Sequence, residues 1–469
     1  AQAILAQGIN HRGGGRGTRT ALGMGVLWAP EETNIFAAIR ARQASGTPLR
    51  RSVRGNLSWV QRYELTSILK GHHGCVNTIQ WSPDATLLCS GSDDRCVNLW
   101  RLDKGNTGGT VSSVSTLMTM HRHNIFDAQL TSCQQRVISC GADGCVCLTQ
   151  VEGSEQHRQL LYEPDAGHYL ASKIAFMGRA SPGAFLVTFG DGRIRMFDLR
   201  ERDHRVAVDT SGVGLTGIEL QPTNDKILAV GGNDPFLRLY DLRAITFYRE
   251  DVLPSPGGAP TAAVSLHTTP ALLHPAARHR RGASRVWSST SDVGISGVSW
   301  SPNGRSLLAN YRSSDVVLFD MSGSGEGGAD ASALARGRST SDEDGAPAGG
   351  GPGVPASEYR AGLPQSAAAR EAIAQFLQAR DEFQLPSDRI LLNAAQAYKG
   401  RVNEQTCAKE VRFLCGGAAV GTGGDCGSFF IWEAATGRLL RKLPADRCVV
   451  NCVAPHPLQP LICTSGIDA

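Results

Sequence analysis

The sequence predicts an all-β fold, a β-propeller of seven blades. Two neighbouring 16-residue segments point to this class, because each ends in an aromatic residue followed by Asp-Leu-Arg: FLVTFGDGRIRMFDLR (Phe185–Arg200) and LAVGGNDPFLRLYDLR (Leu228–Arg243). In both segments an Asp stands six residues before the aromatic residue, and this interval recurs elsewhere in the chain. Repetition at a fixed period indicates a repeat architecture, in which each unit buries its apolar face against a neighbour.

The clearest unit covers Leu69–Trp100. Apolar and polar residues alternate along it, and a turn at Ser82-Pro83-Asp84 separates two of its apolar stretches. Alternation with a period of two, bounded by Gly, Pro, Asp and Ser, indicates strands joined by tight turns. The unit opens with Gly71-His72 and closes with Trp100, a pattern typical of WD40 repeats, which place four strands in each blade.

Further units close at a similar spacing along the chain. The first four closing positions are 100, 149, 197 and 240, which are 49, 48 and 43 residues apart. A fifth unit closes at Phe319-Asp320 and a sixth at Trp432-Glu433. A seventh begins near residue 449 and stops at Ala469, so we expect the last blade to be truncated, without its last two strands.

The repeat also predicts a structural hydrogen-bonded network within the blades. In WD40 blades the turn Asp, the His of the Gly-His pair and the closing Trp usually form one buried set. The candidates in the first blade are His72, Asp94 and Trp100, and the turn aspartates of the next three blades are Asp143, Asp191 and Asp234. Thr149, Phe197 and Tyr240 stand where those three blades would carry the Trp.

Four segments follow from these repeats. Residues 1–55 form a basic and mostly disordered arm with a short helix near 30–43. Residues 56–320 hold blades 1–5, with a long Pro-, Ala-, His- and Arg-rich loop at 251–290. Residues 321–397 are an insert of low complexity, rich in Gly, Ala and Ser and too poor in apolar residues to fold, with a helical patch at 364–383. Residues 398–469 hold blades 6 and 7, of which blade 7 is incomplete.

Composition excludes several classes of protein. The 13 cysteines are odd in number and show neither a Cys-x-x-Cys pair nor a Cys/His metal spacing, which favours free thiols in an intracellular, reducing compartment. No apolar run reaches 18 residues, so we expect no membrane span. The sequence also lacks nucleophile-elbow, P-loop, kinase and His-Glu-x-x-His patterns. We therefore expect no active site, cofactor, metal or small-molecule ligand.

Charge is distributed unevenly. Residues 1–55 carry eight arginines and two glutamates, a net charge of +6, so the remainder of a chain of net charge +4 carries −2. A solvated, disordered leader explains this arm most simply. The alternative is that the arm contacts nucleic acid, which would make the protein a WD40 scaffold of a nuclear assembly associated with RNA or chromatin.

The two Asp-x-Arg endings are the candidate binding site. Arg200 and Arg243 are expected just beyond the third strand of two adjacent blades, and all such turns lie on one rim of a propeller. Planar guanidinium groups suit carboxylate or carbonyl groups of a partner, and Asp198 and Asp241 are placed to orient them. Asp is common at this position in such blades, so two consecutive Asp-x-Arg boxes are a stronger indication than one.

The chain resembles WD40-repeat substrate receptors of cullin-4 RING ubiquitin ligases, and within them the factor-eight branch of the cullin-4-associated factors. The resemblance covers about residues 56–250, 291–320 and 398–468, and it rests on these segments: VQRYELTSILKGHHGCVN (Val60–Asn77), HRHNIFDAQ (His121–Gln129), the two Asp-x-Arg segments, YKGRVNEQTCAKEVRF (Tyr398–Phe413), GDCGSFFIWE and the tail DRCVVNCVAPHPLQPLICTSGID. Gly400-Arg401 stands where that branch has Gly-His, so this blade is expected to lack its His-based network.

The resemblance implies a non-enzymatic receptor. Such a protein binds the ligase adaptor, the large damage-specific DNA-binding subunit, and recruits protein substrates for ubiquitination. Asp198, Arg200, Asp241 and Arg243 are the adaptor-binding residues that it implies, and an intracellular location in the nucleus and cytoplasm follows. The helical segment at 30–43 is a further candidate for adaptor contact. The sequence does not identify the substrate.

Overall fold

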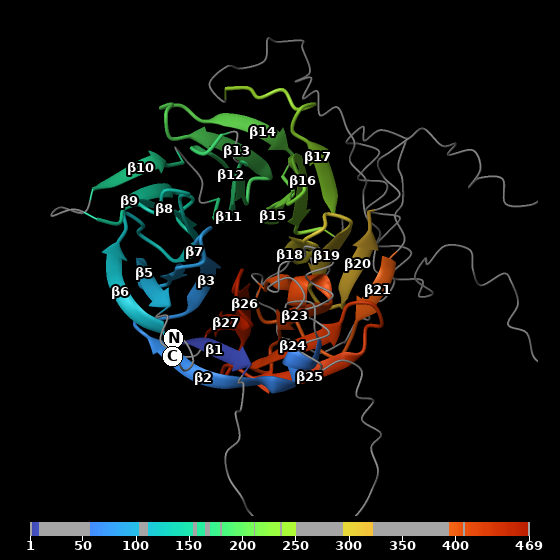
Figure 1. Cartoon of the computed structure of the whole chain (residues 1–469). Coiled ribbons are helices and arrows are strands. Elements are labelled where there is room, and N and C mark those ends of the chain that lie inside the picture. Colours follow the sequence, from blue (N-terminus) through green and yellow to red (C-terminus); the bar gives the residue numbers. More distant parts are fainter. Residues whose placement is uncertain are drawn as a thin grey trace, which may run out of the picture.

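The structure is a computed structural model, and it describes residues 2–8, 57–102, 111–152, 157–164, 169–178, 181–210, 212–234, 237–249, 294–321, 394–406 and 409–467. Within these ranges the strands form seven sheets arranged in a ring (Figure 1). The predicted helices near 30–43 and 364–383, and the predicted loop at 251–290, lie outside the described residues.

The first three sheets are built from consecutive antiparallel strands, and in each sheet the strand numbers rise from the centre of the ring outward. The first contains β3 (Val76–Trp81), β4 (Leu87–Ser92), β5 (Cys96–Leu102) and β6 (Val111–Met118). The second contains β7 (Ile125–Leu130), β8 (Arg136–Gly141), β9 (Val146–Gln150) and β10 (Arg158–Tyr162). The third contains β11 (Ala171–Phe176), β12 (Ala184–Phe189), β13 (Arg193–Asp198) and β14 (Arg205–Asp209).

Three further sheets follow the same plan. The fourth contains β15 (Leu215–Gln221), β16 (Asn224–Gly232) and β17 (Arg238–Asp241). The fifth contains β18 (Ile295–Trp300), β19 (Ser306–Tyr311), β20 (Val316–Asp320) and β21 (Ala394–Tyr398). The sixth contains β22 (Val411–Leu414), β23 (Ala419–Gly423), β24 (Ser428–Glu433) and β25 (Leu439–Pro444), with the short 3-10 turn η3 (Cys415–Gly417) between its first two strands. These six blades confirm the predicted all-β WD40 propeller.

The remaining sheet, here called the terminal sheet, joins the two ends of the described chain. Its order is β2 (Tyr63–Lys70), β1 (Gln2–Gly8), β27 (Leu461–Gly466) and β26 (Val450–Pro455), and the 3-10 turn η1 (Leu57–Arg62) leads into β2. The last blade was expected to lack two strands. That expectation is wrong for this sheet, because β1 pairs antiparallel with both β27 and β2 and fills the missing places.

Two predicted boundaries also change. The strand β1 lies inside the arm at 1–55, which the sequence predicts to be mostly disordered; the hydrogen-bonding edge of β27 gives these seven residues a partner strand. The predicted insert at 321–397 extends too far, because β21 begins at Ala394 and pairs with β20 as the outer strand of the fifth sheet. Its small Ala and Gln side chains gave no strand signal of their own.

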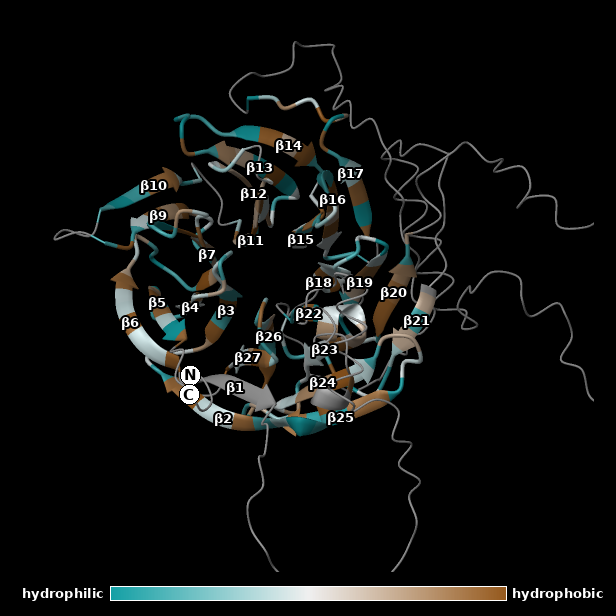
Figure 2. Ribbon diagram, in the orientation of Figure 1, coloured by the Kyte–Doolittle hydropathy of each residue, from teal (hydrophilic) through white to brown (hydrophobic). Residues whose placement is uncertain are grey.

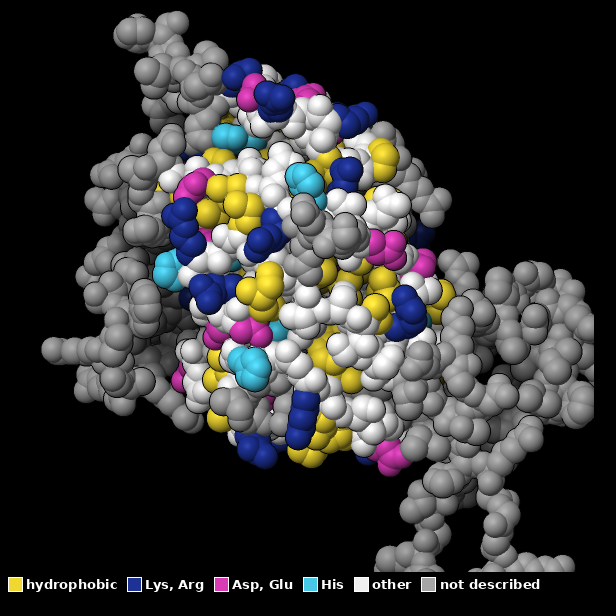
Figure 3. All heavy atoms as spheres, turned by 90° about the vertical axis from the view of Figure 1, so that its left-hand side faces the viewer, with side chains coloured by type: hydrophobic (Ala, Val, Ile, Leu, Met, Phe, Trp, Pro, Cys, Tyr) yellow, Lys and Arg dark blue, Asp and Glu magenta, His cyan; other side chains and the backbone are white. Residues whose placement is uncertain are grey.

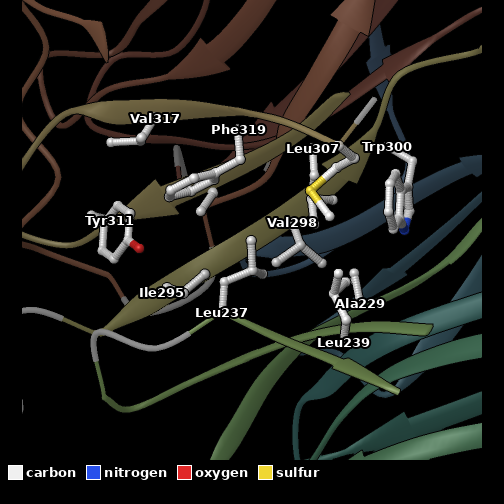
Figure 4. Close-up of a cluster of buried hydrophobic side chains, with 12 residues drawn as sticks. Ala229, Leu237, Leu239, Ile295, Val298, Trp300, Leu307, Tyr311, Val317 and Phe319 are labelled. Atoms are coloured by element: carbon white, nitrogen blue, oxygen red, sulfur yellow. The ribbon is translucent and has the colours of Figure 1, made fainter. Parts of the chain in front are cut away.

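The core lies between neighbouring sheets. One cluster joins the fourth sheet to the fifth: Leu237 and Leu239 face Ile295, Trp300 and Phe319 (Figure 4). Equivalent apolar clusters occupy the other junctions, and hydrophobic residues follow the strands while hydrophilic ones gather at the turns (Figure 2). Because each sheet buries an apolar face on both neighbours, the ring holds each turn in a fixed position.

Candidate functional site

The turn after β13 presents Arg200 in a fixed orientation. The carboxylate of Asp198 accepts a hydrogen bond from the backbone N–H of Arg200 at 3.0 Å. It also accepts two from the guanidinium, from Nε at 2.9 Å and from Nη2 at 2.6 Å. A fork of two parallel charge-assisted hydrogen bonds fixes the plane of the guanidinium.

The turn after β17 repeats this arrangement. The backbone N–H of Arg243 donates to Asp241 Oδ1 at 2.9 Å, Nε donates to the same oxygen at 3.0 Å, and Nη2 donates to Oδ2 at 2.6 Å. The local sequence explains the match, because an Asp ending a strand accepts from the N–H two residues later and so forms an Asx turn. The following Arg then lies beside that carboxylate.

Exposure differs sharply within each pair. The Arg200 and Arg243 side chains are 72% and 66% exposed, whereas those of Asp198 and Asp241 are 9% and 15% exposed. The hydrogen bonds from Arg200 lower the pKa of Asp198, and each aspartate raises the pKa of its arginine. Both guanidinium groups are therefore held as cations, and only part of their five N–H donors is used by the aspartates.

The two turns lie on adjacent sheets. Strands β11 and β12 of the third sheet lie against β15 of the fourth, and one apolar cluster, including Leu186, Val208, Ile218 and Tyr240, fills the junction. Because each turn follows the third strand of its sheet, both lie on the same rim, as the sequence predicts. The structure thus pairs Asp198 with Arg200 and Asp241 with Arg243, on the turns of two adjacent sheets.

The opposite ends of the same strands carry a second kind of Asp–Arg pair. Asp191 pairs with Arg195 at 2.8 Å, and Asp234 pairs with Arg238, with Nη1 of that arginine 2.8 Å from Oδ1. Arg195 is 3% exposed and its guanidinium carbon lies 4.5 Å from the centre of the Phe189 ring. In these two sheets an arginine therefore satisfies the turn aspartate in place of the histidine.

The first two sheets use histidine for this purpose. His72 Nδ1 lies 2.9 Å from Asp94 Oδ2, His72 Nε2 lies 2.8 Å from Ser90 Oγ, and Trp100 Nε1 donates to the same Ser90 Oγ at 2.9 Å. In the second sheet His121 bridges Asp143 and Ser139 in the same way, at 3.0 Å to each. His72, Asp94 and Trp100 thus form one hydrogen-bonded chain through Ser90.

The turn aspartates of the first two sheets, Asp94 and Asp143, are held ionised. Burial alone would raise the pKa of Asp143, but hydrogen bonds from His121 and from the backbone N–H groups of Arg122 and Cys145 outweigh it and lower the pKa to about 2. The pKa of Asp94 is lowered for the same reasons, since the bonds from His72, His73 and Cys96 outweigh its burial. These aspartates fix the turns between second and third strands.

Sequence reasoning missed three features. One is the pairing of Arg195 and Arg238 with the turn aspartates; an Arg two residues before each closing aromatic residue was the available signal. Another is the set of contacts made by Arg401, which the sequence places where a Gly-His pair is usual: this arginine is buried and donates through Nη2 to Asn310 Oδ1 and to the Tyr311 carbonyl oxygen, at 3.1 Å for the latter. Burial lowers its pKa to about 10.

The third missed feature is a cluster of charges on or next to the innermost strands of four sheets, here called the central cluster. Lys173 of β11 contacts Glu410 at 2.5 Å and lies 3.9 Å from Asp127 of β7. Arg412 of β22 contacts Glu219 of β15 at 3.2 Å. No spacing along the chain indicates this cluster, because its members are up to 285 positions apart and only the ring brings them together.

Other kinds of site are not seen in the described part of the chain. Its residues include no group of three or more His, Cys, Asp and Glu that could hold a metal ion. None of its helices has the length and apolarity needed to cross a membrane. On the side of the ring where β6 and β10 lie, basic, acidic and apolar side chains are interspersed (Figure 3).

Comparisons with known proteins agree with this fold. Residues 63–101 match the model of the family "WD domain, G-beta repeat", the stretch that includes the clearest repeat in the sequence. Residues 63–101 thus carry a WD40 repeat.

Two sets of relatives are similar over more than half of the chain. "WD and tetratricopeptide repeats protein 1" of Mus musculus is 30% identical over 303 residues, which is 58% of this chain and 42% of that protein. "DDB1- and CUL4-associated factor 6" of Homo sapiens is 26% identical over 282 residues, 58% of this chain and 30% of that protein. The chain thus spans less than half the length of these relatives. The resemblance to WD40 cullin-4-associated factors is confirmed; the factor-eight branch stays a prediction.

Proposed function

We propose that this chain is a substrate receptor of a cullin-4 RING ubiquitin ligase. In this role it has no active site of its own, docks on the ligase adaptor and recruits protein substrates for ubiquitination. The pair of exposed guanidinium groups, each oriented by a carboxylate and both on one rim of adjacent sheets, is the observation that carries the proposal. The likeness to factor 6, whose name associates it with DDB1 and CUL4, supports the choice of adaptor.

The geometry suits a docking site more than a catalytic one. Each guanidinium keeps N–H donors beyond those bonded to its own aspartate, and these can bind carboxylate or carbonyl oxygens on a facing protein. Arg is among the residues that most often dominate binding energy at protein interfaces. Because Asp198 and Asp241 already orient the side chains, little rotamer freedom is lost on binding, which favours affinity.

Three finer features belong to this proposal. The terminal sheet is the seventh blade of a closed propeller, and the substrate-binding surface is formed by loops of several blades. The protein works in the nucleus and the cytoplasm, which imaging of a tagged full-length protein can test. The helical segment predicted near 30–43 is a second adaptor contact, and its deletion tests that role separately from the arginines.

The central test compares an Arg200→Ala/Arg243→Ala double variant with wild type in binding to purified DDB1. Loss of the two arginines of the proposed interface is expected to weaken adaptor binding by roughly 100-fold or more. Arg438→Ala is the matched control, because Arg438 is 70% exposed, pairs with Glu433 and lies in the corresponding turn of the sixth sheet. Full adaptor binding by the folded double variant would contradict the proposal.

A scaffold associated with RNA or chromatin is the alternative, and the +6 charge of residues 1–55 is the observation that favours it. It predicts nucleic-acid binding that weakens steeply with salt and disappears when these residues are removed. Such binding, together with an adaptor affinity that does not depend on Arg200 and Arg243, would favour the scaffold over the receptor.

A further inference from the structure

The chain after Arg243 leaves its own sheet. In the part of the chain that the structure describes, the fourth sheet has three strands, whereas the other sheets have four. Residues 245–249, here called the crossing segment, run instead along the outer strand β14 of the third sheet (Figure 1). The segment therefore starts at one Asp-x-Arg turn and ends beside the other.

Backbone hydrogen bonds join the crossing segment to β14. The N–H of Val206 donates to the carbonyl oxygen of Tyr248 at 2.8 Å, and the N–H of Tyr248 donates to the carbonyl oxygen of Val206 at 3.1 Å. This is the reciprocal pair of an antiparallel bridge. Val206 lies six residues after Arg200, directly beyond its turn.

Side chains strengthen the same junction. Ile245 and Phe247 are partly buried against the apolar cluster shared by the third and fourth sheets. Beyond them, Arg249 Nη1 lies 2.9 Å from Asp203 Oδ2, and Asp203 stands three residues after Arg200. Both members of this ion pair are more than half exposed, so its own contribution to stability is small.

We infer that the crossing segment is a staple that fixes the two Asp-x-Arg turns relative to each other. Asp203, Phe247, Tyr248 and Arg249 are its positioning residues. A partner that contacts both arginines then meets them at a set separation and does not have to order two independent turns on binding. The effect on adaptor binding rests on the proposed function, whereas the staple itself is a property of the free protein.

The test uses Tyr248→Pro in the full chain, because proline removes the N–H that donates to Val206. Tyr248→Ala is the matched control, since it removes the same side chain and keeps that N–H. In hydrogen exchange of the free protein, we expect the amides of residues 199–206 to exchange about tenfold faster in Tyr248→Pro than in Tyr248→Ala, and turns on other sheets to stay unchanged. Equal exchange in the two variants would overturn the staple.

Adaptor binding supplies a second readout. We expect Tyr248→Pro to weaken DDB1 binding about tenfold relative to Tyr248→Ala at a similar melting temperature, and to abolish the coupling between Arg200→Ala and Arg243→Ala in a double-mutant cycle.

The two proposals fail separately. Suppose that Tyr248→Pro exchanges faster but binds the adaptor as wild type does, while the arginine double variant loses adaptor binding. That result would overturn the positioning role of the crossing segment. If the arginine double variant also binds normally, the docking proposal fails and the exchange result alone decides the staple.

Discussion

An Asp–Arg pair lies near each end of strand β13, and the two pairs differ in the exposure of the arginine. At one end Arg195 is 3% exposed and stacks on aromatic rings beside Asp191. At the other end Arg200 is 72% exposed beside Asp198. The same two residue types, at a similar distance, thus hold a blade together in one place and face outward in the other.

The neighbouring sheet repeats the contrast with Asp234–Arg238 and Asp241–Arg243. Burial is therefore the property that assigns each arginine its role. An exposed pair adds little to stability, and its repetition on two adjacent turns is the basis of the proposed docking site. The first two sheets support this interpretation, because there a histidine holds the turn aspartate and no exposed Asp-x-Arg ending follows.

The largest effect is expected from breaking the buried pair. Arg195→Ala leaves Asp191 without its guanidinium partner, and losing one member of a buried ion pair costs about 3–5 kcal/mol of the free energy of unfolding. Denaturant unfolding measures this difference. Arg200→Ala serves as the control and should leave the unfolding midpoint unchanged; similar losses in the two variants would remove the contrast between the pairs.

A smaller effect on stability is expected from the central cluster, whose side chains lie between the buried and the exposed pairs in their exposure. Burial within the central cluster raises the pKa of Glu219 to about 7, although the positive charge of Arg412 opposes this shift. A carboxyl group whose pKa is raised on folding favours the folded state at low pH. Its contribution is complete below about pH 4.5 and is lost as the pH rises through 7, by up to about 3 kcal/mol.

Glu219→Gln tests this assignment, because the amide resembles the protonated carboxyl group at every pH. We expect the variant and wild type to be equally stable near pH 4.5 and the variant to be more stable at pH 8. Thermal unfolding across this range gives the comparison. A difference in stability between the two proteins that is the same at all pH values would show that Glu219 does not titrate in this range in the folded protein.

The smallest effect concerns the histidine-based network. Trp100→Phe keeps the aromatic ring against the sheet and removes the indole N–H that donates to Ser90. One such hydrogen bond contributes about 1 kcal/mol, so urea unfolding should shift by about this amount. Thr149→Ser in the second sheet, where no tryptophan is present, is the control, and a larger loss there would contradict the role given to Trp100.

Much of the fold was accessible from local patterns. Alternating apolar residues, turn aspartates and closing aromatic residues placed the third strands β5, β9, β13, β17, β20 and β24 correctly, because these signals lie within one blade. The pairing of Arg200 with Asp198 and of Arg243 with Asp241 was equally local, since each involves residues two positions apart. Contacts of this range are fixed by strand and turn geometry alone.

Apart from the local pairing of Arg195 and Arg238 with their turn aspartates, the features that were missed depend on the ring. The two strands completing the terminal sheet come from the opposite end of the chain, the central cluster joins four sheets, and the crossing segment pairs with β14 of the neighbouring sheet. By itself the sequence determined the repeated blade and the two Asp-x-Arg turns, because both arise within a few tens of residues. Only the tertiary structure decided which arginines are buried and which are exposed, because burial depends on what the neighbouring sheets cover.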